Sequence, residues 1–389
     1  MSGRSARLVA GLMALVLIGA GVAAATVDSA ARPGRVADSS YGVGLKLTSK
    51  VVAHGTVLNI VQPWLRWNSK TCSYEVAKTH PATYVANTRQ IVGNWQIGYM
   101  HYGNSDPFGI ANSKSVADTA SLAGFKLNVY NLEYPSKTVP LDQAKLSVLR
   151  KDRGVMQGNL EPTVLPAFFK ILQTDGCVPT IAVYGGPGDK TPAIGAIFED
   201  TGRLQGEWMA KEAKARGWLP TDTAFLQCTD PSIAPFVQKI FPASLKALLK
   251  GGFNLPPKNL YKVNCQGQSP TNARQVVTDW FTGHPNFKHV LINAPDDLRV
   301  TGIIQALKAS GRLDSSTIRI GAGLDPIGRA QVRAGTEDAS VAFFPEHYGL
   351  FLLPVLEDVM AGKPVPQFVQ HVQVVVTKKT IGKYYPNGK

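Results

Sequence analysis

The feature that most constrains the fold is the stretch 95–131, in which an apolar strand, a loop rich in Gly, Asn and Pro, a helical face and a second apolar strand follow one another. This order is that of a βαβ unit. Pro107 suits the first turn of the helix, and Asp106 suits its cap. Ligands bind outside the carboxyl ends of the strands in open parallel sheets. The expected binding edge therefore carries Asp106 and Phe108, and it has no glycine-rich dinucleotide fingerprint.

The alternation continues through the chain and divides into two series. The first series has strands predicted at about 95–101, 126–131, 153–158, 179–184 and 193–198, and helices at about 109–123, 140–150, 161–175 and 200–217. The second has strands at about 223–228, 259–264, 288–293, 317–321 and 339–343, and helices at about 233–250, 270–282, 297–310, 326–334 and 346–361. A last strand is predicted at 367–376. The pattern predicts an α/β protein with two doubly wound parallel-sheet (Rossmann-like) lobes.

The N-terminus has the composition of an export signal. Arg4 and Arg7 precede an uncharged apolar run at 8–25, which is followed by small residues that a signal peptidase could accept. We expect residues 1–26 to be a signal peptide, with an uncleaved membrane anchor as the alternative. The segment 27–94 has no clear period but is rich in aromatic residues, and we expect it to pack on the first lobe.

The chain is basic and globular. Its 389 residues carry 41 Lys and Arg against 27 Asp and Glu, and 44% of them are hydrophobic. Without residues 1–26 the chain has 39 basic and 27 acidic residues, a net charge of +12. The basic residues are scattered, with no aromatic-interleaved stripe, so nucleic acid is not an expected partner. A solvated surface facing anionic envelope polymer is the preferred interpretation.

Four cysteines suit an exported chain with up to two disulfides. Cys228 and Cys265 follow what should be neighbouring parallel strands, close enough to be bridged. Cys177 could then hold Cys72 in the N-terminal segment. The alternative is that any of them is a free buried thiol.

Five segments carry a resemblance to a known family: 105–108, 155–162, 198–209, 290–306 and 335–363. Together they resemble the type I periplasmic binding proteins of the ribose-binding kind, the solute-binding subunits of sugar ABC transporters. The resemblance covers roughly residues 95–376. It implies a protein that closes on a small molecule between two lobes and passes it to a membrane permease. An N-terminal export signal, in place of a DNA-binding headpiece, disfavours a repressor.

The resemblance also implies three hinge crossings between the lobes. A proline marks each expected crossing, at Leu219 and Pro220, at Phe344 and Pro345, and at 364–366; the alternative is that these prolines only end helices and strands. The first lobe would then comprise 95–218 and 345–364, and the second 219–344 and 365–389.

The resemblance places the ligand-binding residues at Asp106, Phe108, Tyr184, Asp296 and Phe343. Phe108 matches an aromatic position, but Gly109 replaces a second ring. Tyr184 and Gly185 replace an Asp-Arg pair, and Phe343 replaces a Gln. A late-strand Asp falls on Gly323 or, with a small shift, on Asp325. The expected ligand is sugar-like or more aromatic and apolar.

Each of these residues has a structural alternative. Asp106 could be only a helix cap, and Phe343 could belong to the core. Asp296 and Asp297 could be a cap pair, or Asp297 could cap the helix while Asp296 points into the cleft.

Catalytic motifs are not found in the sequence. It contains no GxSxG elbow and no HExxH, and its seven histidines show no metal-ligand spacing, although His101 and His347 approach the expected cleft edge. We expect a monomeric extracytoplasmic binding protein without catalytic residues, metal or cofactor, which meets the membrane only if the N-terminal segment is retained. The competing hypothesis is a secreted envelope enzyme, or an interaction or sensing module, that reuses the fold.

Overall fold

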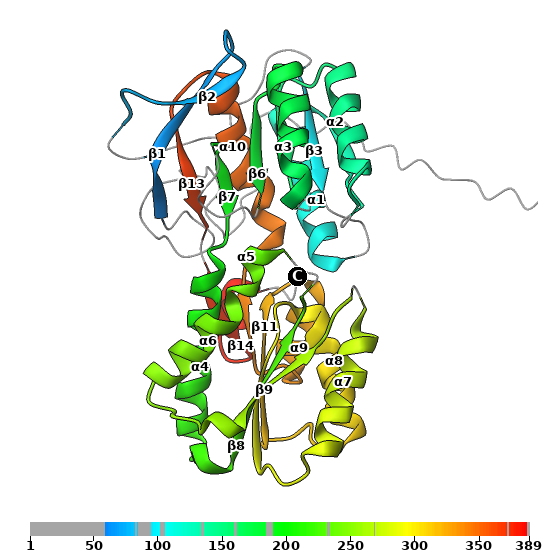
Figure 1. Cartoon of the computed structure of the whole chain (residues 1–389), viewed down its shortest axis with the longest axis vertical. Coiled ribbons are helices and arrows are strands. Elements are labelled where there is room, and N and C mark those ends of the chain that lie inside the picture. The colour runs from blue at the N-terminus through cyan, green and yellow to red at the C-terminus, as the bar shows by residue number, and fades with distance from the viewer. Residues whose placement is uncertain are drawn as a thin grey trace, which may run out of the picture. The chain divides into compact units, whose positions relative to one another are not determined.

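The computed structural model describes residues 59–81, 84, 95–101, 106–133, 136–158, 162–183, 190–231, 234–267, 269–371 and 373–386. The predicted export signal lies outside these ranges. Within them the chain forms two sheets with helices on both faces of each, as predicted (Figure 1). No helix in the described part of the chain has the length and apolarity that a membrane span requires.

The first sheet has eight strands in the order β2-β1-β13-β7-β6-β5-β3-β4. The strands from β13 to β4 are parallel, and β1 and β2 add an antiparallel edge. Their bounds are β1 (Asn59–Asn68), β2 (Ser73–Val76), β3 (Gln96–His101), β4 (Lys126–Asn131), β5 (Val155–Gln157), β6 (Thr180–Val183), β7 (Ala193–Gly195) and β13 (Val365–Gln370). Strands β1 and β2 come from the N-terminal segment, and their pairing places this part of it on the first lobe.

Two layers of helices cover the first sheet. The residues of α1 (Pro107–Ala123) and α10 (Tyr348–Met360) join one apolar core cluster. The residues of α2 (Val139–Leu149), α3 (Leu165–Phe169) and the π-helical segment Lys170–Asp175 join a second cluster with β3 and β5. A short 3-10 turn, Pro162–Val164, precedes α3.

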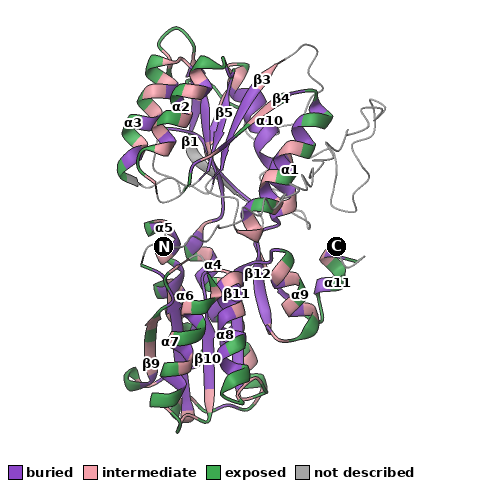
Figure 2. Cartoon of the chain, turned by 90° about the vertical axis from the view of Figure 1, so that its right-hand side faces the viewer, coloured by how far each residue is buried: buried purple, intermediate pink, exposed green. Residues whose placement is uncertain are grey.

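The second sheet has six strands in the order β14-β12-β11-β10-β8-β9, of which only β14 is antiparallel. The strands are β8 (Thr223–Thr229), β9 (Leu260–Asn264), β10 (His289–Asn293), β11 (Thr317–Gly323), β12 (Ala339–Ala342) and β14 (Val374–Thr377). The helices are α4 (Phe198–Ala215), α5 (Pro235–Gln238), α6 (Ile240–Lys250), α7 (Pro270–Gly283), α8 (Asp297–Ala309), α9 (Pro326–Ala334) and α11 (Ile381–Tyr384). The 3-10 turns are Pro220–Asp222, Pro257–Asn259 and Pro345–His347. The central strands are buried and the outer helix faces exposed (Figure 2).

Helix α4 corrects the expected position of the first crossing. It was assigned to the first lobe, but its buried residues Phe198, Met209 and Ala213 join the core of the second lobe. The chain therefore crosses after β7, before residue 198, rather than at Leu219 and Pro220. The apolar face of a helix can be predicted from the sequence, but the sheet that it packs on cannot, because the packing of a helix on a sheet is a tertiary contact.

The strand predicted at 367–376 is two strands. Strand β13 pairs with β1 and β7 in the first sheet, and β14 pairs with β12 in the second. The third crossing therefore lies between β13 and β14, and the prolines at 364–366 lie at the start of β13 instead. The two apolar halves of this stretch are buried in different cores, which a period-2 pattern cannot reveal. The crossing expected at Phe344 and Pro345 does lie between β12 and α10.

Both predicted disulfides are confirmed. Cys228 is bonded to Cys265, with 5.4 Å between their Cα atoms, and Cys72 to Cys177, with 4.8 Å. The two bonds use all four cysteines of the chain. The Cys72–Cys177 bond fastens the turn between β1 and β2 to the segment before β6.

Two glycines allow α4 and α6 to pack closely. A Cβ atom added at Gly202 would lie 2.1 Å from the carbonyl oxygen of Ile240, and one at Gly206 would lie 2.1 Å from that of Ser244. These oxygens belong to the backbone and cannot move aside as a side chain could. A larger residue must therefore push the two helices apart.

We expect Gly206→Ala to lower the free energy of unfolding by about 1–3 kcal/mol, the usual cost of overpacking. Gly283→Ala is the matched control, because a Cβ atom there meets no atom within 4 Å. Urea denaturation of the two variants measures the difference. Equal midpoints would show that the contact between α4 and α6 is not as tight as described.

Candidate ligand-binding site

Three aspartates mark the carboxyl-end edges of the two sheets. Asp106 caps α1 after β3, Asp296 caps α8 after β10, and Asp325 caps α9 after β11. Each side chain accepts a hydrogen bond from a backbone N–H in the first turn of its helix, over 2.7–2.9 Å. An Asp cap satisfies a free N–H and complements the positive end of the helix dipole. The predicted cap role of Asp106 is thus present in the structure.

Aromatic rings from both series of elements meet beside these caps. The ring centre of Phe108 lies 6.1 Å from that of Phe343, edge to face, and 5.9 Å from that of Tyr348. A Cβ atom added at Gly323 would lie 3.4 Å from Cδ2 of Phe108, so this ring also reaches the end of β11. Phe198 continues the chain of rings, with its centre 5.9 Å from that of Phe343. The structure therefore brings Phe108 and Phe343 together.

The two rings differ in exposure. Phe108 is half-buried, whereas Phe343 keeps only 6% of its surface exposed and packs in the core of the second lobe. The core alternative therefore describes Phe343 in this structure, where it supports Phe108. Phe108 is the more exposed of the two residues at the sheet edge.

The cap role expected of Asp297 belongs to Asp296. Asp296, and not Asp297, caps α8, and its side chain remains 31% exposed. Asp297 is fully buried, and its carboxylate accepts hydrogen bonds from the Ser340 hydroxyl, over 2.6 Å, and from the Asp325 N–H, over 3.0 Å. The helix begins at Asp297, one residue earlier than a cap at Asp297 would allow, so Asp297 lies inside the first turn.

Buried carboxyl groups lie behind this edge. Burial, followed by the charge of Asp325, raises the pKa of Asp297 well above its ordinary value. Burial, followed by the charge of Asp297, does the same to the pKa of Glu337. Burial, together with the charges of Asp106 and Asp296, raises the pKa of Asp325 to about 6. Each of these three carboxyl groups therefore holds its proton more tightly than an exposed carboxyl group does.

Three further residues were named in the sequence analysis. Tyr184 lies outside the described residues. His101 and His347 are buried, and their rings stack on Tyr99 and Phe344 respectively. Among the described residues no three His, Cys, Asp or Glu side chains are placed to hold a metal ion.

A family model described as a periplasmic binding protein domain matches residues 97–364. The chain belongs to this family. The fold of two α/β lobes is that of a periplasmic binding protein of type I. A search of curated proteins gives no match.

Solved structures share the fold of this periplasmic binding protein. A solute-binding protein from Actinobacillus succinogenes 130z with bound D-allose aligns with a TM-score of 0.63 and 17% identity, covering 75% of this chain and 100% of that one. A periplasmic ribose ABC transporter protein from Conexibacter woesei aligns with a TM-score of 0.62 and 15% identity, covering 78% of this chain and 97% of that one. A solute-binding protein from Bacillus halodurans C-125 with bound myo-inositol aligns with a TM-score of 0.62 and 16% identity, covering 77% of this chain and 99% of that one.

Sequence reasoning missed Asp230 and Arg299. Asp230 follows β8 directly, and Arg299 lies in the first turn of α8. The available signal was the position of Asp230 at a strand end, the same signal that selected Asp106 and Asp296. Arg299 gave no such signal, because a single basic residue in a helix is usually solvated.

Proposed function

We propose that this periplasmic binding protein captures a small neutral molecule with hydroxyl groups and one apolar face, and delivers it to the permease of an ABC importer outside the cytoplasm. The observation that carries the proposal is the meeting of Phe108 with Phe343 and Gly323 beside three aspartate caps. An aromatic face suits the C–H face of a sugar ring, and carboxylate oxygens accept hydrogen bonds from its hydroxyl groups.

The solutes named for the similar structures support a sugar-like ligand. They include D-allose, ribose and myo-inositol. All three are uncharged and rich in hydroxyl groups, which suits a site with aromatic and carboxylate groups. We further propose that the protein binds its solute without converting it and acts as a monomer.

Export from the cytoplasm agrees with the covalent structure. Both disulfides need an oxidising compartment to form and persist. The basic and apolar start of the sequence would supply the export signal, or an anchor if it is not cleaved.

The proposal predicts that Phe108→Ala weakens binding by about 1–3 kcal/mol, which is about 5- to 150-fold. Calorimetric titration of the wild type and the variant with D-ribose, D-allose, L-arabinose and myo-inositol measures this loss. Ile110→Ala is the control, because Ile110 lies on the same helix and is 53% exposed. An unchanged dissociation constant in Phe108→Ala would remove this ring from the site.

A further inference from the structure

Arg299 is the most unusual buried residue of the second lobe. It lies in the first turn of α8, and only 2% of its surface is exposed. Arginine is rarely buried to this degree unless its charge is paired. Burial of this side chain therefore needs partners for its five N–H groups.

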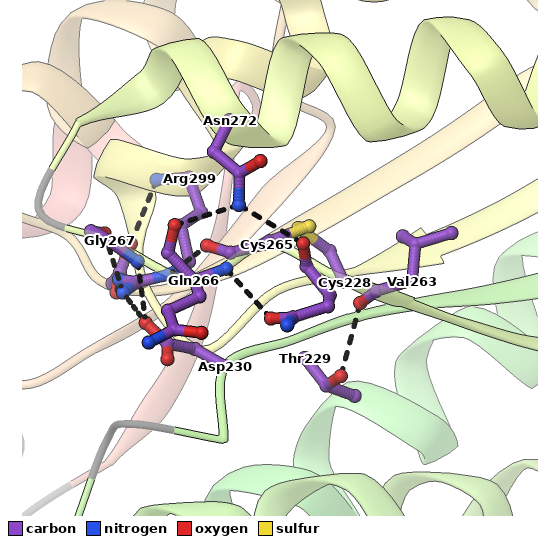
Figure 3. Close-up of a disulfide and its surroundings, with 11 residues drawn as sticks. Cys228, Thr229, Asp230, Val263, Cys265, Gln266, Gly267, Asn272 and Arg299 are labelled. Carbon is purple, nitrogen blue, oxygen red and sulfur yellow. Dashed lines mark hydrogen bonds and ion pairs between the residues drawn. A yellow bond between two sulfur atoms is a disulfide. The ribbon is translucent and has the colours of Figure 1, made fainter.

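The guanidinium group has four partners. Figure 3 labels three of the residues that supply them, Asp230, Cys265 and Gly267. Nε donates to the carbonyl oxygen of Cys265 over 3.2 Å, and Nη2 donates to that of Gly267 over 2.9 Å. Nη2 also pairs with the carboxylate of Asp230, and Nη1 pairs with that of Asp296. The side chain thus bonds two carboxylates and two backbone carbonyls.

These partners belong to three different loops. Asp230 follows β8, Cys265 and Gly267 follow β9, and Asp296 follows β10. The three strands are neighbours in the sheet, in the order β10-β8-β9. One buried side chain therefore fastens three consecutive loops at the edge where the second lobe would meet its ligand.

The disulfide strengthens the same region. Cys228 at the end of β8 is bonded to Cys265, whose N–H donates to the carbonyl oxygen of Thr229 over 2.7 Å. The N–H of Gly267 donates to the carboxylate of Asp230 over 3.3 Å. Covalent and charge-assisted contacts thus hold the loops after β8 and β9 together.

We propose that Arg299 is a positioning residue of the binding site, which fixes Asp296 and the loops after β8 and β9 in the orientation that receives the solute. The inference rests on the proposed function. One guanidinium faces two carboxylates, so one negative charge is left over. The side chain of Asp230 is 1% exposed and that of Asp296 is 31% exposed. Asp296 is therefore the carboxylate that a solute can reach and to which a solute hydroxyl group can donate a hydrogen bond.

Lysine cannot replace arginine in this role. Its ammonium is a point charge with three donors, whereas the planar fork of arginine serves several partners in fixed directions. Arg299→Lys keeps the positive charge beside Asp230 and Asp296 but cannot serve both carboxylates and both carbonyls. This variant therefore separates the fastening of the loops from the neutralisation of charge.

Amide hydrogen exchange on the full chain tests the proposal without a solute. We expect Arg299→Lys to speed exchange at least tenfold in 229–231, 264–267 and 294–296 together, and to leave the central strands β10 and β11 unchanged. Arg203→Lys is the control, because Arg203 makes exposed ion pairs with Asp200 and Glu207 on α4. Faster exchange in only one of the three loops, or equally throughout the second lobe, would overturn the proposal.

A second variant covers the case in which Arg299→Lys does not fold. Asp230→Asn keeps Arg299 and its contacts to Cys265, Gly267 and Asp296. We expect it to speed exchange in 229–231 and to leave 294–296 as in the wild type. Faster exchange in 294–296 would show that Arg299 does not hold that loop on its own.

Affinity provides the readout that a purely structural role would not move. The wild type and Arg299→Lys are titrated with D-ribose, D-allose, L-arabinose and myo-inositol at a temperature where both proteins are folded. For any of these solutes that the wild type binds, we expect the dissociation constant of Arg299→Lys to be at least tenfold higher. Unchanged affinity with loosened loops would contradict the positioning role. If the wild type binds none of the four, the proposed function fails for these sugars, and the exchange measurement still decides whether Arg299 fastens the loops.

Discussion

Raising the pH from about 3 to about 7 is expected to remove about 3 kcal/mol that Asp325 contributes to the free energy of unfolding. Asp325 binds its proton more tightly in the folded protein, where its pKa is about 6, than in the unfolded chain, where the ordinary value is 3.8. The stabilisation by this proton is complete at pH values below the pKa of Asp325 in the unfolded chain. It is lost as the pH rises through the pKa of Asp325 in the folded protein. The raised pKa values of Asp297 and Glu337 act in the same direction and extend the loss to higher pH.

Urea denaturation across this pH range, on the wild type and on Asp325→Asn, measures the effect. Asparagine is an equally good helix cap but does not titrate, so the variant should retain α9 and lose most of the dependence below about pH 6. Stability that rises across this interval in the wild type, or an unchanged profile in the variant, would be incompatible with a buried Asp325.

Removing the Cys228–Cys265 bond is expected to lower the free energy of unfolding by about 2–4 kcal/mol. The bond closes a loop over a sequence separation of 37 residues, which restricts the unfolded chain. Cys265 also supplies the carbonyl oxygen that accepts a hydrogen bond from Arg299. The double variant Cys228→Ala and Cys265→Ala should therefore lose stability and also loosen the loops after β8 and β9.

The first-lobe disulfide provides the matched control. The double variant Cys72→Ala and Cys177→Ala removes a bond that spans 105 residues and should also destabilise the protein. Its hydrogen exchange at 229–231 and 264–267 should equal that of the wild type. Equal loosening of these loops in both double variants would show that the second-lobe bond has no local role.

The secondary structure was largely readable from the sequence because its signals are local. Helix α8 was expected at 297–310 and spans Asp297–Ala309, and the strand expected at 288–293 is β10 (His289–Asn293). The helix expected at 233–250 is divided into α5 and α6 by a turn at Lys239. Pro242, in the first turn of α6, has no N–H to bond the carbonyl oxygen of Gln238 four residues earlier. Apolar period and caps predict that an element exists, and they do not predict the sheet on which it packs, as α4 and β13 show.

The site could be predicted only in part for the same reason. Phe108 was selected because an aromatic residue in the first turn after a strand end has a fixed place at the sheet edge. Arg299 and Asp230 are 69 residues apart in the sequence, and they meet because β8 and β10 are adjacent strands in the sheet. The burial of Glu337 beside Asp297 is equally non-local.

The most direct test of the two-lobed binding site is native mass spectrometry of the wild type and Phe108→Ala, each equilibrated separately with D-ribose, D-allose, L-arabinose and myo-inositol. The account predicts a complex of one protein with one solute molecule for at least one of the four, and clearly lower occupancy in Phe108→Ala. No complex with any of them, or equal occupancy in the two proteins, would contradict it.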